Sequence, residues 1–210
     1  MTAPVVCRVI GVGGAGCNIL LAAWSSGLLH DGRSQFACVC MGSTKEIASA
    51  NMLHPDLAPI RTVQLGRFGA HGNMNIARAA ALKHDSSLRS LVAGADVVIL
   101  VAGIGGGTGS TVAPILARMA EKSGALVLGC IVTPYKWELG RYPSAFAAVK
   151  ELERHSHFLV SMPNEKMGGL FGVDSTLDEV IVGQEILGAA CIHRLMVDGQ
   201  FYIERRRRPA

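Results

Sequence analysis

Short apolar runs alternate with segments of helical periodicity along most of the chain. The apolar runs are rich in β-branched residues and predict strands over residues 5–12, 36–41, 60–65, 96–102, 125–132 and 158–162. Helical spacing predicts helices after the first strand and over residues 75–91, 111–122 and 144–155, with Pro114 in a first turn. Because strands that alternate with helices form parallel sheets, we expect an α/β fold with a doubly wound, mostly parallel sheet.

A longer amphipathic pattern follows the last predicted strand. The positions that recur at helical spacing are Leu177, Val180, Ile181, Gln184, Leu187, Cys191 and Leu195. They predict one long helix over residues 176–196. No low-complexity linker or internal repeat divides the chain, so most of its 210 residues are expected to form one domain.

Composition and charge narrow the function classes. Half of the residues are hydrophobic, which excludes a disordered chain, and no stretch of about 18 residues lacks both charges and glycine clusters, which argues against a membrane span. The formal net charge of +4 equals the contribution of Arg205, Arg206, Arg207 and Arg208. The rest of the chain is neutral and carries no specific nucleic-acid signal. These arginines predict an anionic partner or membrane surface, and a merely solvated end is the alternative.

The six cysteines form no C-x-x-C pair, so neither a zinc site nor a redox dithiol is expected. Buried free thiols in a reducing compartment are the better interpretation. The first residues lack the basic and apolar regions of a signal peptide. We therefore expect a cytoplasmic protein without a metal site.

Glycine-rich segments follow three of the predicted strands and precede helices, at residues 11–16, 66–72 and 103–109. In a parallel sheet these segments meet at the carboxyl ends of the strands, where ligands bind. Glycine backbone and helix N-termini together bind anions without a lysine. The three segments therefore predict a nucleotide polyphosphate, and plain structural turns are the alternative.

The two commonest nucleotide motifs fit poorly. Gly11, Gly13 and Gly16 satisfy the dinucleotide pattern G-x-G-x-x-G, but the second strand ends in Cys40-Met41-Gly42 without an acid for the ribose. A Walker A loop needs G-K-[ST], and no lysine follows these glycines. An NAD-dependent enzyme is a distant alternative, because no acid–base pair accompanies the motif.

Residues 103–110, Gly-Ile-Gly-Gly-Gly-Thr-Gly-Ser, resemble the tubulin signature G-G-G-T-G-[ST]-G. Their flanks are similar to FtsZ, the bacterial tubulin-like cell-division GTPase family, in order over about residues 5–195. The resemblance implies a GTP-binding domain over residues 1–175, a central helix over 176–197 packed on it, a basic tail over 198–210, and absence of the second FtsZ domain.

The resemblance also implies site residues. The first phosphate loop would contribute Gly13, Gly14, Ala15, Cys17 and Asn18. The loop near the terminal phosphate would contribute Gly69, Ala70, His71, Gly72 and Asn73. The signature would contribute Gly105, Gly106, Gly107, Thr108, Gly109 and Ser110. The ribose and base would be contacted by Pro134, Glu138, Arg141, Asn164 and Glu185. The ligand implied is GTP or GDP, with any Mg²⁺ held through the phosphates.

Hydrolysis stays open at this point, and with it the question of whether the chain is an enzyme. In the family, acidic residues after the central helix reach the nucleotide of the next subunit. Here only Asp198 and Glu204 are available, at a different spacing, so they are weak catalytic candidates. We expect weak or assembly-dependent GTP hydrolysis, with self-association or binding to another FtsZ-like protein in cell division or the cytoskeleton. A non-hydrolysing FtsZ-like adaptor or regulator that binds a protein partner, suggested by Cys40-Met41-Gly42 and His71, is the alternative.

Overall fold

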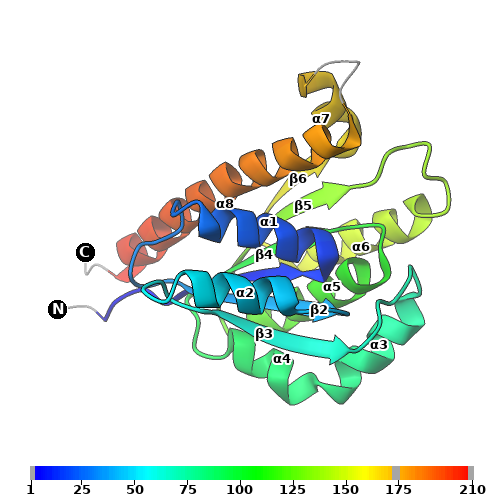
Figure 1. Ribbon diagram of the computed structural model, residues 1–210. Helices are drawn as coiled ribbons and strands as arrows, with labels where there is room; N and C mark the ends of the chain where they lie inside the picture. Colours follow the sequence, from blue (N-terminus) through cyan, green and yellow to red (C-terminus); the bar gives the residue numbers. More distant parts are fainter. Residues whose placement is uncertain (1–2, 172–175, 208–210) are drawn as a thin grey trace.

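The computed structural model describes residues 3–171 and 176–207. Its six-stranded sheet has the order β3-β2-β1-β4-β5-β6, and every pairing between these strands is parallel (Figure 1). The strands are β1 (Cys7–Val12), β2 (Gln35–Met41), β3 (Ile60–Gly66), β4 (Val97–Gly103), β5 (Leu126–Thr133) and β6 (Phe158–Pro163). The expected doubly wound parallel sheet is confirmed, with its switch in strand order between β1 and β4.

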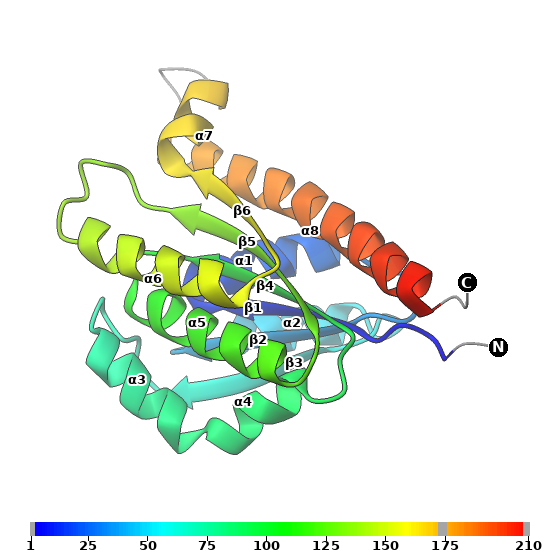
Figure 2. The same ribbon diagram turned by 180° about the vertical axis from the view of Figure 1, so that it is seen from behind.

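Helices cover both faces of this sheet (Figures 1 and 2). They are α1 (Gly13–Ser25), α2 (Lys45–Leu53), α3 (Met74–Lys83), α4 (Asp85–Val92), α5 (Gly107–Lys122), α6 (Tyr142–His155), α7 (Asn164–Phe171) and α8 (Leu177–Arg207). One core cluster joins the sheet to α1, α2 and α8, and a second joins it to α3, α4, α5 and α6. Because β4 is central and covered on both faces, its first six residues are all buried, as its continuous apolar run predicts.

Two helix boundaries differ from the sequence prediction. The single helix expected over residues 75–91 is two helices, because the backbone leaves the helical region at His84 (φ −111°, ψ 21°). The helix expected from residue 111 begins at Gly107, so Pro114 lies inside α5 rather than in its first turn. The glycine signature is therefore itself part of the helix start. Helices α2 and α7 were not predicted.

Helix α8 continues past the expected boundary at residue 197, so the segment predicted as a tail is helical as far as Arg207. The reason is packing at four-residue spacing. A side chain at Gly199 would meet Val97 and Leu128, Ile203 packs against the core, and Arg207 pairs with Asp96. Of the four arginines, Arg208 lies outside the described residues.

Residues Asp178–Arg207 are long and apolar enough to cross a membrane by length and composition alone. However, 44% of their most apolar window is buried inside the structure. A core helix passes the same test, and the contacts of α8 with α1 and the sheet bury one face of it. Its other apolar side chains are exposed, namely Ile181, Val182, Ile186, Leu187, Val197, Phe201 and Tyr202.

Candidate nucleotide-binding site

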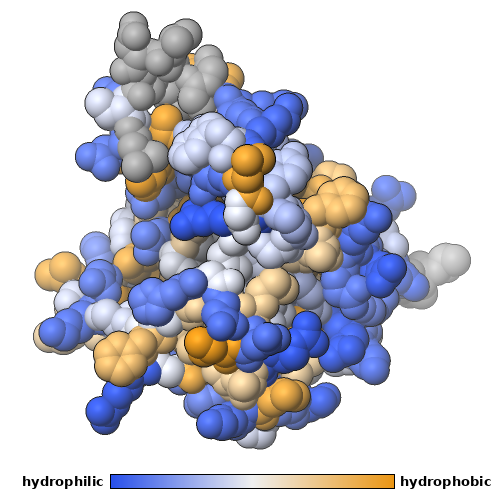
Figure 3. Space-filling view, turned by 90° about the vertical axis from the view of Figure 1, so that its right-hand side faces the viewer, coloured by the Kyte–Doolittle hydropathy of each residue, from blue (hydrophilic) through white to orange (hydrophobic). Residues whose placement is uncertain are grey.

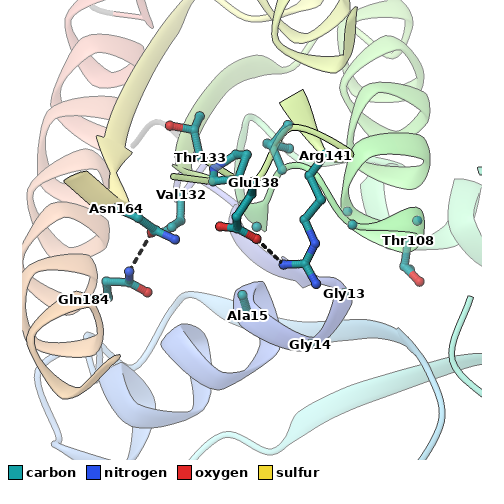
Figure 4. A pocket seen from close by; sticks show the side chains of 16 residues that line it. Gly13, Gly14, Ala15, Thr108, Val132, Thr133, Glu138, Arg141, Asn164 and Gln184 are labelled. Carbon is teal, nitrogen blue, oxygen red and sulfur yellow. Dashed lines mark hydrogen bonds and ion pairs between the residues drawn. The ribbon is translucent and has the colours of Figure 1, made fainter. Parts of the chain in front are cut away.

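A pocket of about 270 Å³ opens at the carboxyl ends of β1, β4 and β5. The face of the molecule seen in Figure 3 is mostly hydrophilic, with apolar side chains scattered rather than gathered. Figure 4 shows the pocket itself, where polar side chains from the β5–α6 loop, α7 and α8 point toward the starts of α1 and α5. This is the position that the order of the sheet predicts for a ligand.

The two helices that begin at the pocket have no side-chain caps. The N-cap residues are Val12 for α1 and Gly106 for α5, and neither makes a side-chain hydrogen bond to its helix. The first turns of both helices therefore present backbone N–H groups and the positive end of the helix dipole to the pocket. Two uncapped helix starts in one pocket favour a ligand with several negative charges.

Close backbone approach explains the glycines here. Gly13 has φ +74°, and a Cβ atom there would lie 3.1 Å from the backbone nitrogen of Gly109. A side chain at Gly13 would therefore strain the backbone at this position and push the start of α5 away by a few tenths of an ångström. The hydroxyl of Ser110 accepts a buried hydrogen bond from the N–H of Gly105 at 2.7 Å. Ser110 thus holds the loop in shape and does not line the pocket.

The loop over residues 69–73 supports the pocket from outside. Ala70 and Asn73 pack so closely on Gly107 that a Cβ atom there would lie 2.7 Å from the Ala70 Cβ atom. The Asn73 side chain caps α3 by accepting from the N–H groups of Asn75 and Ile76, at 2.9 and 3.2 Å. His71 is exposed and adopts a left-handed φ of +46°, which is uncommon for a side chain other than glycine. No residue of this loop lines the pocket.

Glu138 and Arg141 form the wall on the β5–α6 loop. Glu138 accepts from the N–H of Tyr135 at 3.0 Å and from Nη1 of Arg141 at 2.8 Å. The Glu138 side chain is only 14% exposed, whereas that of Arg141 is 65% exposed. The glutamate is therefore fixed in place, and the arginine retains free donors at the pocket mouth.

Two amides lie at the far end of the pocket. Nε2 of Gln184, on α8, donates to Oδ1 of Asn164 at 2.7 Å, and the two side chains point toward each other in Figure 4. Gln184 is buried. Glu185, the predicted acid, does not line the pocket, and partial burial raises its pKa. The sequence pattern places Gln184 among the apolar positions of the helix. A glutamine on an otherwise apolar face is the signal that could have marked it as a site residue.

The structure brings together about half of the predicted residues. Those lining the pocket are Gly13, Gly14, Ala15, Gly106, Gly107, Thr108, Gly109, Pro134, Glu138, Arg141 and Asn164. Those outside its lining are Cys17, Asn18, Gly69, Ala70, His71, Gly72, Asn73, Gly105, Ser110 and Glu185. The residues that sequence reasoning missed are Gly103, Ile104, Val132, Thr133 and Gln184.

Two of the residues outside the lining lie on α1. Cys17 is buried and directs its thiol at the carbonyl oxygens of Gly11 and Val39, at 3.5 and 3.8 Å. The neighbouring Cys38 thiol, together with burial, raises the pKa of Cys17 well above that of a free thiol, so it is an inert core residue. Asn18 is exposed on the same helix.

The sequence matches the family model described as Tubulin/FtsZ family, GTPase domain, over residues 6–172. The chain belongs to the Tubulin/FtsZ family. The cell division protein FtsZ of Neisseria gonorrhoeae is 32% identical over 184 residues, which are 84% of this chain and 43% of that protein. The cell division protein FtsZ 1 of Pyrococcus abyssi is 32% identical over 76% of this chain and 41% of its own length. The chain therefore spans less than half the length of these relatives.

Solved structures of the family share the fold. An FtsZ from M. jannaschii, described as an empty dimer, has a TM-score of 0.76 over 91% of this chain and 54% of its own, at 23% identity. CetZ from Methanosaeta thermophila has a TM-score of 0.69 over 95% of this chain and 54% of its own, at 14% identity. At these identities the likeness shows the fold alone.

Proposed function

We propose that this Tubulin/FtsZ family chain binds GTP or GDP in the pocket between α1, α5 and α8. The observation that carries the proposal is the pair of uncapped helix starts, at Gly13 and Gly107, in one pocket. The phosphates would take the free N–H groups there, with the Thr108 hydroxyl beside them. Arg141, with its free donors, would contact the ribose or a phosphate at the pocket mouth.

The amide pair would contact the base. Nε2 of Gln184 donates a hydrogen bond to Oδ1 of Asn164. The Oε1 atom of Gln184 can therefore accept a hydrogen bond from the base, and the Nδ2 group of Asn164 can donate one. Guanine presents a matching acceptor at O6 and a donor at N1. Adenine also presents one donor and one acceptor, so a neutral amide pair discriminates between these bases less than a carboxylate would.

Hydrolysis would be weak unless chains assemble. Asp198 lies fourteen residues beyond Gln184 on α8, about 21 Å along the helix, so it cannot reach the pocket of its own chain. Its carboxylate accepts from Arg194 at 2.7 Å, and Glu204 lies still further along the helix. Self-association, or association with another FtsZ-like protein, would be needed to bring either acid to a nucleotide. The relatives are named cell division proteins, which supports this setting.

Any Mg²⁺ would be held mainly through the phosphates. Among the residues that the structure describes, no group of three His, Cys, Asp or Glu side chains could hold a metal ion. Glu138, the acid in the pocket lining, already pairs with Arg141. The cation would neutralise phosphate charge, and the protein would contribute backbone N–H groups and the Thr108 hydroxyl.

Isothermal titration calorimetry with GTP, GDP, ATP and NAD tests the binding proposal. We expect saturable binding of GTP and GDP, weaker binding of ATP, and none of NAD. Absence of guanine-nucleotide binding at high micromolar concentration would overturn the proposal. Binding of NAD in preference to GTP would do the same.

A non-hydrolysing regulator is the second candidate, favoured by the distance of Asp198 and Glu204 along α8 from the pocket of their own chain. Phosphate release measured against protein concentration separates it from the first. Turnover that rises steeply with concentration and is lost in Asp198→Ala or Glu204→Ala supports an assembling GTPase. Flat, negligible release together with tight GTP binding supports the regulator.

A further inference from the structure

A second cavity, of about 290 Å³, lies under α4 at the amino ends of β1, β2 and β3, the end of β1 opposite to the nucleotide pocket. Strand register places its polar residues on one face of the sheet. Arg8 is the register partner of Gln35, and Arg61 is the partner of Ala37, which lies two residues after Gln35. Because side chains alternate along a strand, both arginines point to the α4 side.

Arg8 uses only one edge of its guanidinium within the fold. Its Nη1 donates to the carbonyl oxygens of Ser90 and Leu91, at 3.0 and 2.9 Å, in the last turn of α4. These contacts hold the side chain in place and satisfy helix C-terminal carbonyls. Its Nε is buried and has no acceptor among the described residues. A buried Nε cannot be reached from the cavity, so the donors that Arg8 can offer to a ligand there are those of Nη2, which makes no hydrogen bond to the described residues.

Arg61 brings a second positive charge to the same cavity. Its Nη2 donates to the hydroxyl of Ser90 at 3.1 Å, which directs the guanidinium toward Arg8. Burial and the nearby charge of Arg61 lower the pKa of Arg8. None of the described residues that line the cavity is acidic. Two cations thus share a partly buried space without a counter-charge, an arrangement that an anionic ligand would stabilise.

The remaining walls are mostly apolar and consist of Ile10, Phe36, Ala37, Ala58, Pro59 and Leu91. We propose that this cavity binds a small amphipathic anion, with one oxyanion group between Arg8 and Arg61 and a short apolar body against these walls. The cavity is at the small end of the roughly 300–1,000 Å³ range of ligand pockets, so the body is short. The site is independent of nucleotide binding.

Hexanoate is a suitable probe, because it combines one carboxylate with a short apolar chain. Titration of the ¹⁵N-labelled full chain, observed at the arginine Nε–H resonances, should give saturable shifts of Arg8 and Arg61 at millimolar concentration or below. Hexan-1-ol and inorganic phosphate should each bind at least about tenfold more weakly, because hexan-1-ol lacks the negative charge and phosphate lacks the apolar chain. Unmoved Arg8 and Arg61 resonances, or equal binding of either comparison compound, would overturn the proposal.

A variant at the exposed arginine tests the same site without disturbing the α4 contacts of Arg8. Arg61→Gln should weaken hexanoate binding by about tenfold or more through loss of a charged donor. Arg118→Gln removes the same charge from an exposed position on α5 that does not line this cavity, and binding should be unchanged. Unchanged hexanoate affinity in Arg61→Gln, with an unfolding temperature like that of the unsubstituted chain, would refute the assignment.

Discussion

Nε2 of Gln184 donates a hydrogen bond across 2.7 Å to Oδ1 of Asn164, which joins the first turns of α8 to the start of α7 at the candidate nucleotide pocket. The bond orients both amides and decides which atoms face the ligand. Helix α8 therefore contributes to the site through a side chain that the sequence pattern had placed in the core.

Gln184→Ala should weaken GTP binding by about tenfold, because it removes a buried acceptor for the base and leaves Asn164 without its partner. Gln184→Glu should increase the preference for GTP over ATP, since a carboxylate accepts from both guanine N1–H and N2–H. Calorimetric titration of each variant with both nucleotides measures these effects. Glu185→Gln is the matched control, and a larger loss in that control than in Gln184→Ala would show that the base is contacted by Glu185 instead.

Gly107→Ala should lower the free energy of unfolding by about 1–3 kcal/mol, because the new methyl group would overlap Ala70 and the Asn73 backbone. Gly106→Ala is a close control, since nothing lies within 4 Å of a Cβ atom at that neighbouring position. Its effect should stay within about 0.5 kcal/mol. Urea denaturation of the two variants gives the comparison, and equal losses would contradict the packing of the 69–73 loop on α5.

Asp31 gives the fold part of its resistance to acid. Burial opposes ionisation of its carboxyl group, but hydrogen bonds from Ser34, Arg33 and Gln200 outweigh it and lower its pKa. A depressed folded-state pKa contributes stability above the unfolded value, near 3.9, and this contribution disappears as the pH falls through the folded value. Asp31→Asn should therefore lower the unfolding temperature at pH 7, and the gap to the unsubstituted chain should shrink below about pH 4.

Unfolding temperatures between pH 7 and pH 3 check this prediction. Asp56→Asn is the control, because Asp56 is an exposed aspartate. A gap for Asp31→Asn that stays constant over this range would mean that its effect does not depend on ionisation.

The prediction of an anionic partner now concerns Arg205 and Arg206. Arg205 lies over the ring of Phe201 and Arg206 over that of Tyr202, each about 5.8 Å from the ring centroid, whereas Arg207 is paired with Asp96. The double variant Arg205→Gln/Arg206→Gln should reduce co-sedimentation with vesicles that contain anionic lipid, because each arginine near such a surface contributes about 1 kcal/mol. Arg118→Gln is the charge-matched control. Co-sedimentation unaffected by the double variant would leave only a role in solubility.

The local patterns along the chain were enough to predict the parallel sheet, its strands and the glycine loops. Buried strands such as β4 are continuous apolar runs in the sequence. Gly13 and Gly107 lie at the first positions of α1 and α5, where another segment packs closely against the helix start. An apolar run and a glycine that follows a strand are local features, so a single sequence records them directly. The segments that approach Gly13 and Gly107 lie far away in the chain and are known only from the structure.

Which polar side chains face the ligand was decided only by the tertiary structure. Gln184 and Glu185 are adjacent on α8, and a helix rotates about 100° per residue, so the packing of α8 on α1 and the sheet determines which of them reaches the pocket. The same holds for Arg207, whose partner Asp96 is distant in the chain. The sequence alone determined the order of the strands, helices and glycine loops and the residue types near the site. Packing around the shared core determined the rotation of α8 and which distant side chains meet.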